Sequence, residues 1–180
     1  MTVQNFDIPF YEERGPGTFA ELTPTPKTFV EGTDFTTMPF SGSGDVTGRL
    51  VPTTDIEIPP APAPNSTSGC EPADFPAAVS GNVALVQRGT CDFSVKAANA
   101  KAAGAKAVVI FNEGQPGRTD LFPTAAMDVP IDIPVLKATF QVGADLYAQT
   151  QAGPVTVHVT TNTLSENRPT SNVIGETYFG

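Results

Sequence analysis

The sequence predicts a β-rich mixed α/β domain built around a βαβ unit. Two short, continuous apolar runs, Val83–Val86 and Ala107–Phe111, flank an alanine-rich segment, Phe93–Ala103. Proline contributes 18 and glycine 16 of the 180 residues, which favours short strands and many loops over a helical bundle. Valines alternate with polar residues over 155–159 and add a half-buried strand.

Little regular structure is predicted for the first 44 residues. Phe6, Ile8 and Phe10 alternate with polar residues and Pro9, which indicates one short strand. Stretches rich in glycine, proline and serine follow, and these are typical of turns and surface crossings. A strand is expected next, over residues 45–51.

The βαβ unit occupies residues 83–111. Continuous apolar runs are typical of strands that are buried on both faces. Asp92 or Ser94 is available as the N-cap of the helix between them, and Gly104 as its C-terminal stop. Strand, helix and strand in this order predict two parallel strands joined by a right-handed crossover.

Three further elements lie between the βαβ unit and the 155–159 strand. Asn112–Asp120 is expected to be an exposed polar loop directly after the second strand of the βαβ unit. Residues 133–136 predict another strand, with its proline at the edge. A second helix is predicted to begin after Thr139 and to end at Gly153.

The charge balance excludes two classes of partner. The chain has 10 Lys and Arg against 19 Asp and Glu, a formal net charge of −9. Nucleic acid and anionic membrane surfaces both need basic stripes, so neither is expected as a partner. No apolar run reaches the roughly 18 residues of a membrane span.

The two cysteines, Cys70 and Cys91, both lie in turn-like sequence. They form either a disulfide, which indicates an oxidising compartment, or two separate buried thiols. A zinc site in this chain is not expected, because there is no Cys-x-x-Cys pair and His158 is the single histidine. No cofactor is predicted for the chain.

No catalytic constellation is found in the sequence. The chain has no Gly-x-Ser-x-Gly elbow, no His-Glu-x-x-His, no P-loop and no dinucleotide-binding glycine motif. His158 falls on the polar face of its strand, which favours a solvated residue over a catalytic one. Three carboxylate pairs leave an acid-pair hydrolase as an alternative: Glu12 with Glu13, Asp55 with Glu57, and Asp128 with Asp132. We expect a chain without enzymatic activity of its own.

The segment 81–112 resembles the protease-associated (PA) domain, a non-catalytic module of secreted and cell-surface peptidases and some receptors. The matching signature is an apolar strand, Arg88-Gly89-Thr90-Cys91-Asp92-Phe93, an alanine-rich helix with Ala103-Gly104, a second apolar strand and Asn112. The resemblance extends over about residues 45–161. It implies a swivelling β/β/α fold with two flanking helices.

The two ends resemble the junctions of a PA domain inserted into secreted two-zinc aminopeptidases. They are Val3–Phe6 and Ser171–Thr177. The resemblance therefore implies a fragment, with 1–44 and 162–180 as junctions to a catalytic domain outside this chain. Zinc is expected only in that domain, and the protein is expected to be secreted and monomeric.

Two functions compete under this resemblance. A substrate-selecting lid or peptide-binding module would use the loop that follows the βαβ unit, where loops at the carboxyl ends of parallel strands commonly bind ligands. The candidate contacts are Asn112, Glu113, Gly114, Gln115, Arg118 and Phe122. The alternative is a structural spacer or oligomerisation module, with an apolar patch at Phe6, Ile8 and Phe10.

One modification site is also expected. Asn65 begins an Asn-Ser-Thr glycosylation acceptor in a predicted surface loop.

Overall fold

The computed structural model describes residues 2–122 and 126–175. This part of the chain contains eight strands, two α-helices and two short 3-10 helices, Pro72–Asp74 and Ala77–Val79. The strands are β1 (Thr2–Thr23), β2 (Lys27–Thr28), β3 (Phe35–Thr37), β4 (Gly44–Pro52), β5 (Val83–Gln87), β6 (Ala107–Phe111), β7 (Val135–Ala138) and β8 (Thr156–Ile174). The helices are α1 (Phe93–Ala102) and α2 (Phe140–Ala152). One mixed sheet contains all the strands, in the order β2-β1-β8-β4-β5-β6-β7-β3. The predicted β-rich mixed α/β class with two helices is confirmed.

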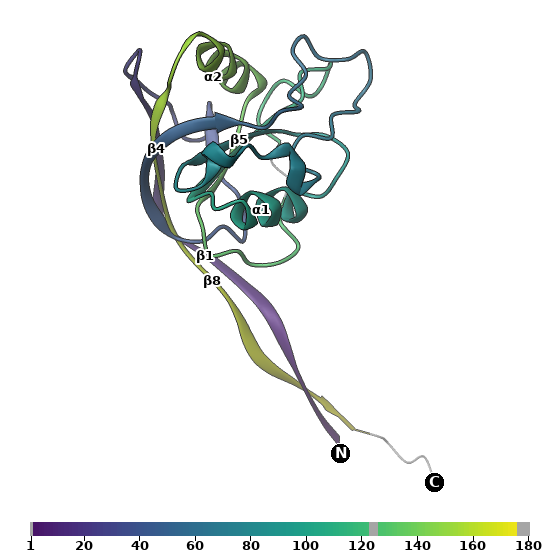
Figure 1. Cartoon of the computed structure of the whole chain (residues 1–180). Helices are drawn as coiled ribbons and strands as arrows, with labels where there is room; N and C mark the ends of the chain where they lie inside the picture. Colours follow the sequence, from purple (N-terminus) through teal and green to yellow (C-terminus); the bar gives the residue numbers. More distant parts are fainter. Residues whose placement is uncertain (1, 123–125, 176–180) are drawn as a thin grey trace.

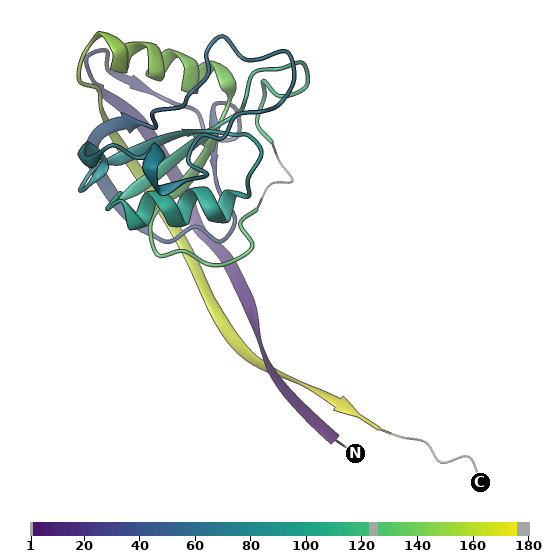
Figure 2. The same cartoon turned by 45° about the vertical axis from the view of Figure 1, so that its right-hand side comes forward.

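The centre of the sheet is parallel and covered on both faces. Strands β4, β5, β6 and β7 run in one direction, with Leu85 opposite Val109 in the β5–β6 pair. Figures 1 and 2 show α1 and α2 on opposite faces of these strands. Every residue of β5 and β6 is buried, because alternate side chains enter two separate apolar clusters. The continuous apolar runs and the βαβ unit are therefore confirmed.

Helix α1 lies close to the sheet because its inner side chains are small. Ala97 and Ala100, on the side of α1 that faces the sheet, are fully buried. Asp92 occupies the N-cap position, although its side chain makes no capping hydrogen bond. Gly104 takes the positive φ of 91° that ends the helix, as its position in the sequence predicts.

Helix α2 packs on the other face through Val142, Gly143 and Leu146. Its first turn is capped by Thr139, whose Oγ1 accepts a hydrogen bond from the Val142 N–H at 3.3 Å. Gly143 is required for the close approach, because a methyl group there would lie 1.9 Å from Cγ of Phe111. None of the described helices is long and apolar enough to cross a membrane.

The expectation for the first 44 residues was wrong in one respect. A single 22-residue strand, β1, replaces the short strand and turns expected there. It pairs antiparallel with β8 over most of its length, from Thr2 opposite Ile174 to Thr23 opposite Thr156. Irregular register between Glu13 and Thr18 accommodates the local glycines and proline as bulges. Pairing with a segment more than 130 residues away supplied order that the local sequence does not indicate.

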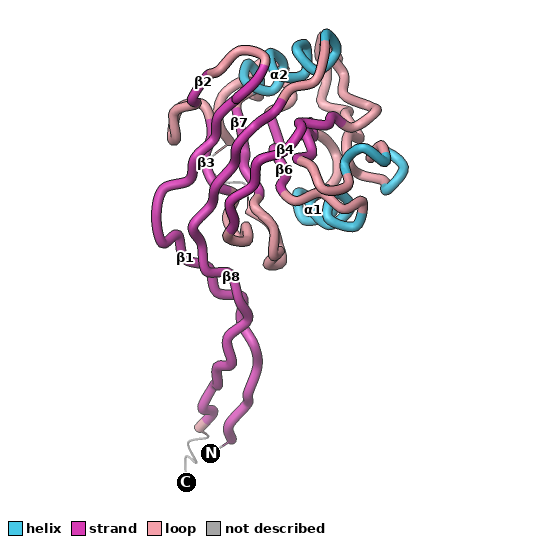
Figure 3. Tube along the Cα trace, turned by 60° about the vertical axis from the view of Figure 1, so that its left-hand side comes forward, coloured by secondary structure: helices cyan, strands magenta, loops and turns pink. Residues whose placement is uncertain are grey.

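Beyond the body of the molecule, β1 and β8 continue as a two-stranded ribbon. Figure 3 shows both strands leaving the body side by side, and Thr2 is still paired with Ile174 at the far end of the ribbon. The apolar pair Val173 and Ile174, at the end of β8, lies on this ribbon and is exposed. Residues 176–180, the last part of the predicted C-terminal junction, lie outside the described residues. The predicted boundaries at 44/45 and 161/162 stay predictions.

Gly143→Ala should destabilise the fold although alanine is the better helix former. The overlap with Phe111 is expected to cost about 1–3 kcal/mol, more than the roughly 1 kcal/mol that helix propensity returns. Chemical denaturation of both proteins measures the difference. Ala148→Gly, on the exposed side of α2, is the control and should lose only the propensity contribution. A Gly143→Ala protein as stable as the parent would contradict the close approach.

Candidate functional site

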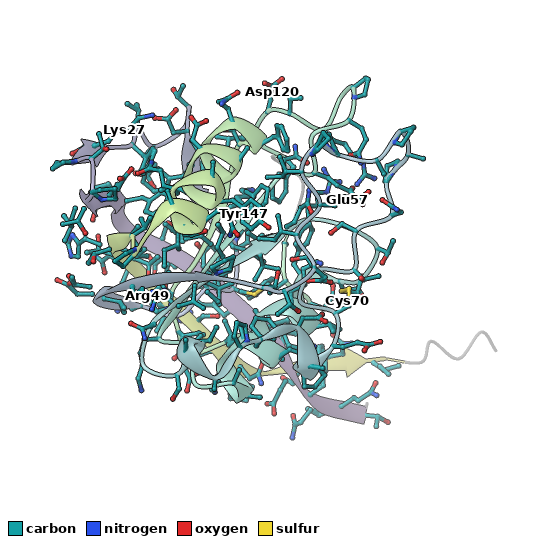
Figure 4. All side chains as sticks on the ribbon, turned by 45° about the horizontal axis from the view of Figure 1, so that its top comes forward. Lys27, Arg49, Glu57, Cys70, Asp120 and Tyr147 are labelled. Carbon is teal, nitrogen blue, oxygen red and sulfur yellow. A yellow bond between two sulfur atoms is a disulfide. The ribbon has the colours of Figure 1, made fainter. Side chains whose placement is uncertain are left out.

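The candidate site is the edge of the sheet where the parallel strands end. Segments 53–71, 88–92 and 112–122 follow β4, β5 and β6, so they meet at this edge. The Cys70–Cys91 disulfide joins the first of them to the second, with the two Cα atoms 5.8 Å apart. Figure 4 shows its sulfur beside the Cys70 label, on the side of the body that carries Glu57. Of the two alternatives for the cysteines, the disulfide is confirmed.

Lys96 lies fully buried beside this disulfide. Its Nζ donates to the Ser68 carbonyl and lies 3.7 Å from Sγ of Cys70. Burial lowers the pKa of Lys96 to about 8, and the carboxylates of Asp55, Glu113 and Asp74 oppose that shift only in part. The lysine therefore ties α1 to the disulfide loop at an electrostatic cost. Its place in an alanine-rich helix gave no signal of this role.

Glu113 is the centre of the hydrogen bonds between the loops. Its Oε1 accepts from the backbone N–H groups of Asn65 at 2.9 Å and Ser66 at 3.0 Å. Its Oε2 accepts from Nη1 of Arg118 at 2.9 Å, and the side chain is 1 % exposed. A buried carboxylate with three donors replaces the strand pairing that these two loops lack.

Gln87, the last residue of β5, makes the second link. Its Nε2 donates to the carbonyls of Glu57 and Glu113 at 3.0 and 3.3 Å, and its Oε1 accepts from the Glu57 N–H at 2.9 Å. Sequence reasoning missed this residue. The available signal was a polar residue at the end of a fully apolar run.

Asn112 closes the loop on itself. Its Nδ2 donates to the Asp120 carbonyl at 2.6 Å, and its Oδ1 accepts from the Glu113 N–H at 2.9 Å. Gly114 adds a turn with a φ of 102°, and its N–H donates to the Arg118 carbonyl at 2.8 Å. A Cβ at Gly114 would collide with Phe140, so glycine is needed there.

The expectation of an exposed polar loop over Asn112–Asp120 is wrong for Asn112, Glu113 and Gln115, which are buried. Their side chains turn inward because they satisfy backbone groups of the same or of neighbouring loops, which a local sequence pattern does not reveal. Phe122, the candidate contact beyond that loop, is buried as well. Phe122 stacks on Phe93 with ring centroids 5.4 Å apart. A role of these residues in peptide binding stays a prediction.

Two arginines form the partly exposed part of this edge. Arg88 lies over the Phe122 ring, 5.0 Å from its centroid, and donates to Oδ1 of Asn112 at 3.3 Å. Burial and then the positive charge of Arg118 lower the pKa of Arg88, so the two guanidinium groups influence each other. Glu113 pairs with Arg118, so the net positive charge of these three groups is that of Arg88. A carboxylate or carbonyl group is the chemistry that such a pair of guanidinium groups binds.

Asn65 is exposed at the same edge, as the glycosylation motif requires. Its backbone N–H donates to Oε1 of Glu113, which fixes the position of the loop at this residue. Glycosylation stays a prediction.

The chain does not offer a zinc site within residues 2–122 and 126–175. No three His, Cys, Asp or Glu side chains there lie close enough together to hold a metal ion. Nε2 of His158 lies 2.8 Å from Oδ1 of the exposed Asp45, on the polar face of β8 as the alternation predicts. Glu12 and Asp132, from two of the carboxylate pairs, are exposed and make ion pairs with Arg14 and Lys101.

Comparison with known protein families gives a direct match. The family model described as the PA domain matches residues 46–146. The chain belongs to the PA domain family. The resemblance in the sequence is thereby confirmed, and it covers the central parallel strands, α1 and the loops of the candidate site.

Curated relatives of this PA domain are aminopeptidases about three times its length. The aminopeptidase of Pseudomonas aeruginosa is 35 % identical over 182 residues, which is 100 % of this chain and 33 % of that protein. A probable leucine aminopeptidase 2 of Aspergillus fumigatus is 31 % identical over 147 residues, 82 % of this chain and 27 % of that protein. The chain thus spans about a third of the length of these relatives.

Solved structures agree on the fold. An aminopeptidase from Aneurinibacillus sp. strain AM-1 superposes with a TM-score of 0.66 at 23 % identity, over 94 % of this chain and 36 % of the other. A zinc aminopeptidase from Bacillus subtilis gives 0.56 at 23 % identity, over 94 % and 35 %.

Glu113→Gln should destabilise the PA domain by about 2 kcal/mol, because it leaves the Arg118 guanidinium without its carboxylate and weakens two bonds to the 65–66 backbone. Chemical denaturation gives the value. Arg118→Gln is the comparison and should cost at least as much, because it leaves the buried Glu113 carboxylate without its positive partner. Equal stability of the parent and Glu113→Gln would show that the loops do not depend on this carboxylate.

The stability of the domain should rise with pH between about 8 and 10. The unfolded chain keeps Lys96 protonated up to its ordinary pKa, whereas the folded chain releases the proton near pH 8, so the unfolded state binds more protons in this window. The effect over the window is roughly 3 kcal/mol at most. Lys96→Met should flatten the dependence, and Lys101→Met, on the exposed face of α1, should not. A rise of equal size in the Lys96→Met protein would assign it to another group.

Proposed function

We propose that this PA domain is a non-catalytic domain inserted into a secreted zinc aminopeptidase, where it selects peptide substrates at the mouth of the active site. The curated relatives are named aminopeptidases, and one similar structure is named a zinc aminopeptidase. The zinc and its ligands would belong to the remaining two thirds of such an enzyme. The disulfide supports an oxidising, extracellular location.

The ribbon is the observation that carries the insertion into a host domain. Thr2 and Ile174 are paired residues, so both ends of the domain leave the body at the same point. Paired positions on antiparallel strands are only about 5 Å apart. A domain with adjacent ends fits into a loop of a host domain without displacing the two sides of that loop.

The selecting surface would be the positive edge formed by Arg88 and Arg118. Hydrogen bonds from Glu113, Gln87 and Asn112 hold the loops in place, so this edge is presented without a large ordering cost. The carboxyl terminus of a short peptide substrate is the group that the two arginines would recognise. Selection would then depend on the distance between this edge and the zinc.

A spacer role is the second candidate, and the ribbon favours it. Phe6 and Ile8 are 40 % and 41 % exposed, and Val173 is 59 % exposed. Such side chains on a two-stranded ribbon would pack on a host domain. The chain would then be monomeric, as we expect, only when that domain covers them.

Excision of the domain from the parent enzyme separates the two roles. Gln4 and Asn172 are paired, so joining them through a short turn removes the body and leaves the ribbon end. For a selecting domain we expect turnover of leucine p-nitroanilide to persist, while the preference between dipeptides and longer peptides changes. Equal loss of activity towards all substrates, together with a lower Tm, would instead favour the spacer.

The double variant Arg88→Gln/Arg118→Gln tests the edge directly. It should reproduce part of the altered length preference, because it removes both guanidinium charges from the edge. The Tm of the double variant measures the cost of leaving Glu113 without Arg118. Arg49→Gln, an exposed arginine on β4, is the matched control. The 180-residue chain alone should not hydrolyse leucine p-nitroanilide, and turnover by it would contradict the non-catalytic role.

A further inference from the structure

The two halves of the Cys70–Cys91 disulfide lie on segments of different exposure. Both cysteines are partly exposed, so the bridge is at the surface of the body. Thr90 and Asp92, on either side of Cys91 in the chain, are exposed. Cys70 instead follows the buried Gly69. The more open approach to the bridge is therefore from the side of Cys91.

A buried ammonium group lies against one of the two sulfur atoms. Nζ of the fully buried Lys96 is 3.7 Å from Sγ of Cys70 and also donates to the Ser68 carbonyl. Among the described residues, Lys96 is the only side chain that donates to either sulfur. Its pKa of about 8, lowered by burial, leaves the lysine mostly protonated at pH 7. The positive charge therefore acts first on Cys70.

This asymmetry decides which sulfur leaves when the bridge is opened. In thiol–disulfide exchange, an attacking thiolate bonds to one sulfur while the other departs with the electron pair of the broken bond, and the thiol of lower pKa departs faster. A neighbouring lysine lowers the pKa of a thiol. Cys70, beside Lys96, is then the better leaving group, and Cys91 is the sulfur that is attacked.

The loops on both sides of the bridge are also held together by hydrogen bonds. Nδ2 of Asn99, on α1, donates to the carbonyls of Gly69 and Cys70 at 3.2 and 2.9 Å. The Thr90 N–H donates to the Ser66 carbonyl at 2.9 Å. Opening the disulfide leaves these contacts in place, so the exchange does not require the domain to unfold.

We propose that Cys91 is a thiol-exchange site, at which a thiolate attacks Sγ while Cys70 leaves as a thiolate beside Lys96. The bond between the two cysteines breaks, and a mixed disulfide forms on Cys91. The electron pair of the broken bond stays on Sγ of Cys70, where the Lys96 ammonium donates a hydrogen bond to it. A second thiolate then attacks the mixed disulfide and releases Cys91. In total two thiols are oxidised to their disulfide, and the bridge takes up two electrons and two protons.

The proposal is independent of the proposed function, because it rests on the surroundings of this disulfide alone. Treatment of the folded 180-residue chain with reduced glutathione, with rapid quenching by N-ethylmaleimide, tests it. The two cysteines fall in different tryptic peptides, because Arg88 lies between them, so mass spectrometry identifies the modification on each. At early times we expect glutathione on Cys91 and maleimide on Cys70, in roughly tenfold excess over the reverse pattern.

Two outcomes of this mapping would overturn the proposal. Equal labelling would show that Lys96 does not direct the exchange. Glutathione mainly on Cys70 would show that Cys91, directly before the N-cap of α1, is the better leaving group.

Substitution of the lysine tests its part in the exchange. Lys96→Met should slow the reduction of the folded domain roughly tenfold and remove the preference for Cys91. Lys96→Gln, which has an amide donor in place of the charge, should give the same result and is the second variant should Lys96→Met fail to fold. Lys101→Met, at an exposed position of α1, is the matched control and should leave the rate unchanged. An unchanged rate and labelling pattern in either Lys96 variant would contradict the proposal.

Urea distinguishes exchange in the folded domain from reduction after unfolding. About 1 M urea, below the unfolding transition, increases the unfolded fraction of a domain of this size at least about fivefold. We expect the rate of reduction by glutathione to change less than twofold. A rate that rises in parallel with the unfolded fraction would show that the bridge is reached only in the unfolded chain, and would overturn the proposal.

Discussion

The antiparallel pairing of β1 with β8 is the constraint on which most of this structure depends. It joins the first and last strands of the chain and brings both into a sheet whose centre is parallel. The same pairing continues past the body, so it also fixes where the two ends of the domain lie (Figure 3). Closing so long a loop costs entropy, and the cost is offset because the inner half of the pair carries core residues, Phe19, Val157 and Val159.

At the carboxyl ends of the parallel strands, buried polar side chains form the hydrogen bonds to backbone groups that strand pairing supplies elsewhere. Loops that approach one another without forming strands leave N–H and carbonyl groups unpaired. Glu113 and Gln87 satisfy several of these groups at once. The disulfide and the buried Lys96 hold the first loop against α1. The result is a shaped edge with two arginines on it, built on loops that have no regular structure of their own.

The loop edge is only partly predictable from the sequence. Its topology and its disulfide are predictable, because apolar runs, helix stops and turn-like cysteines are local signals. The burial of Asn112, Glu113 and Gln115 is not, since a polar residue in a loop looks the same whether its partner is water or a distant backbone N–H.

The sequence by itself determined the β-rich α/β class, the βαβ unit, the two helices with their stops, the polar position of His158 and the resemblance to the PA domain. Each of these depends on residues that are neighbours in the chain. Only the tertiary structure decided that Thr2–Thr23 forms one long strand and that polar side chains of the candidate loop face inward. Those features depend on contacts between residues far apart in the sequence, and the sequence of one segment alone does not predict the free energy of such contacts.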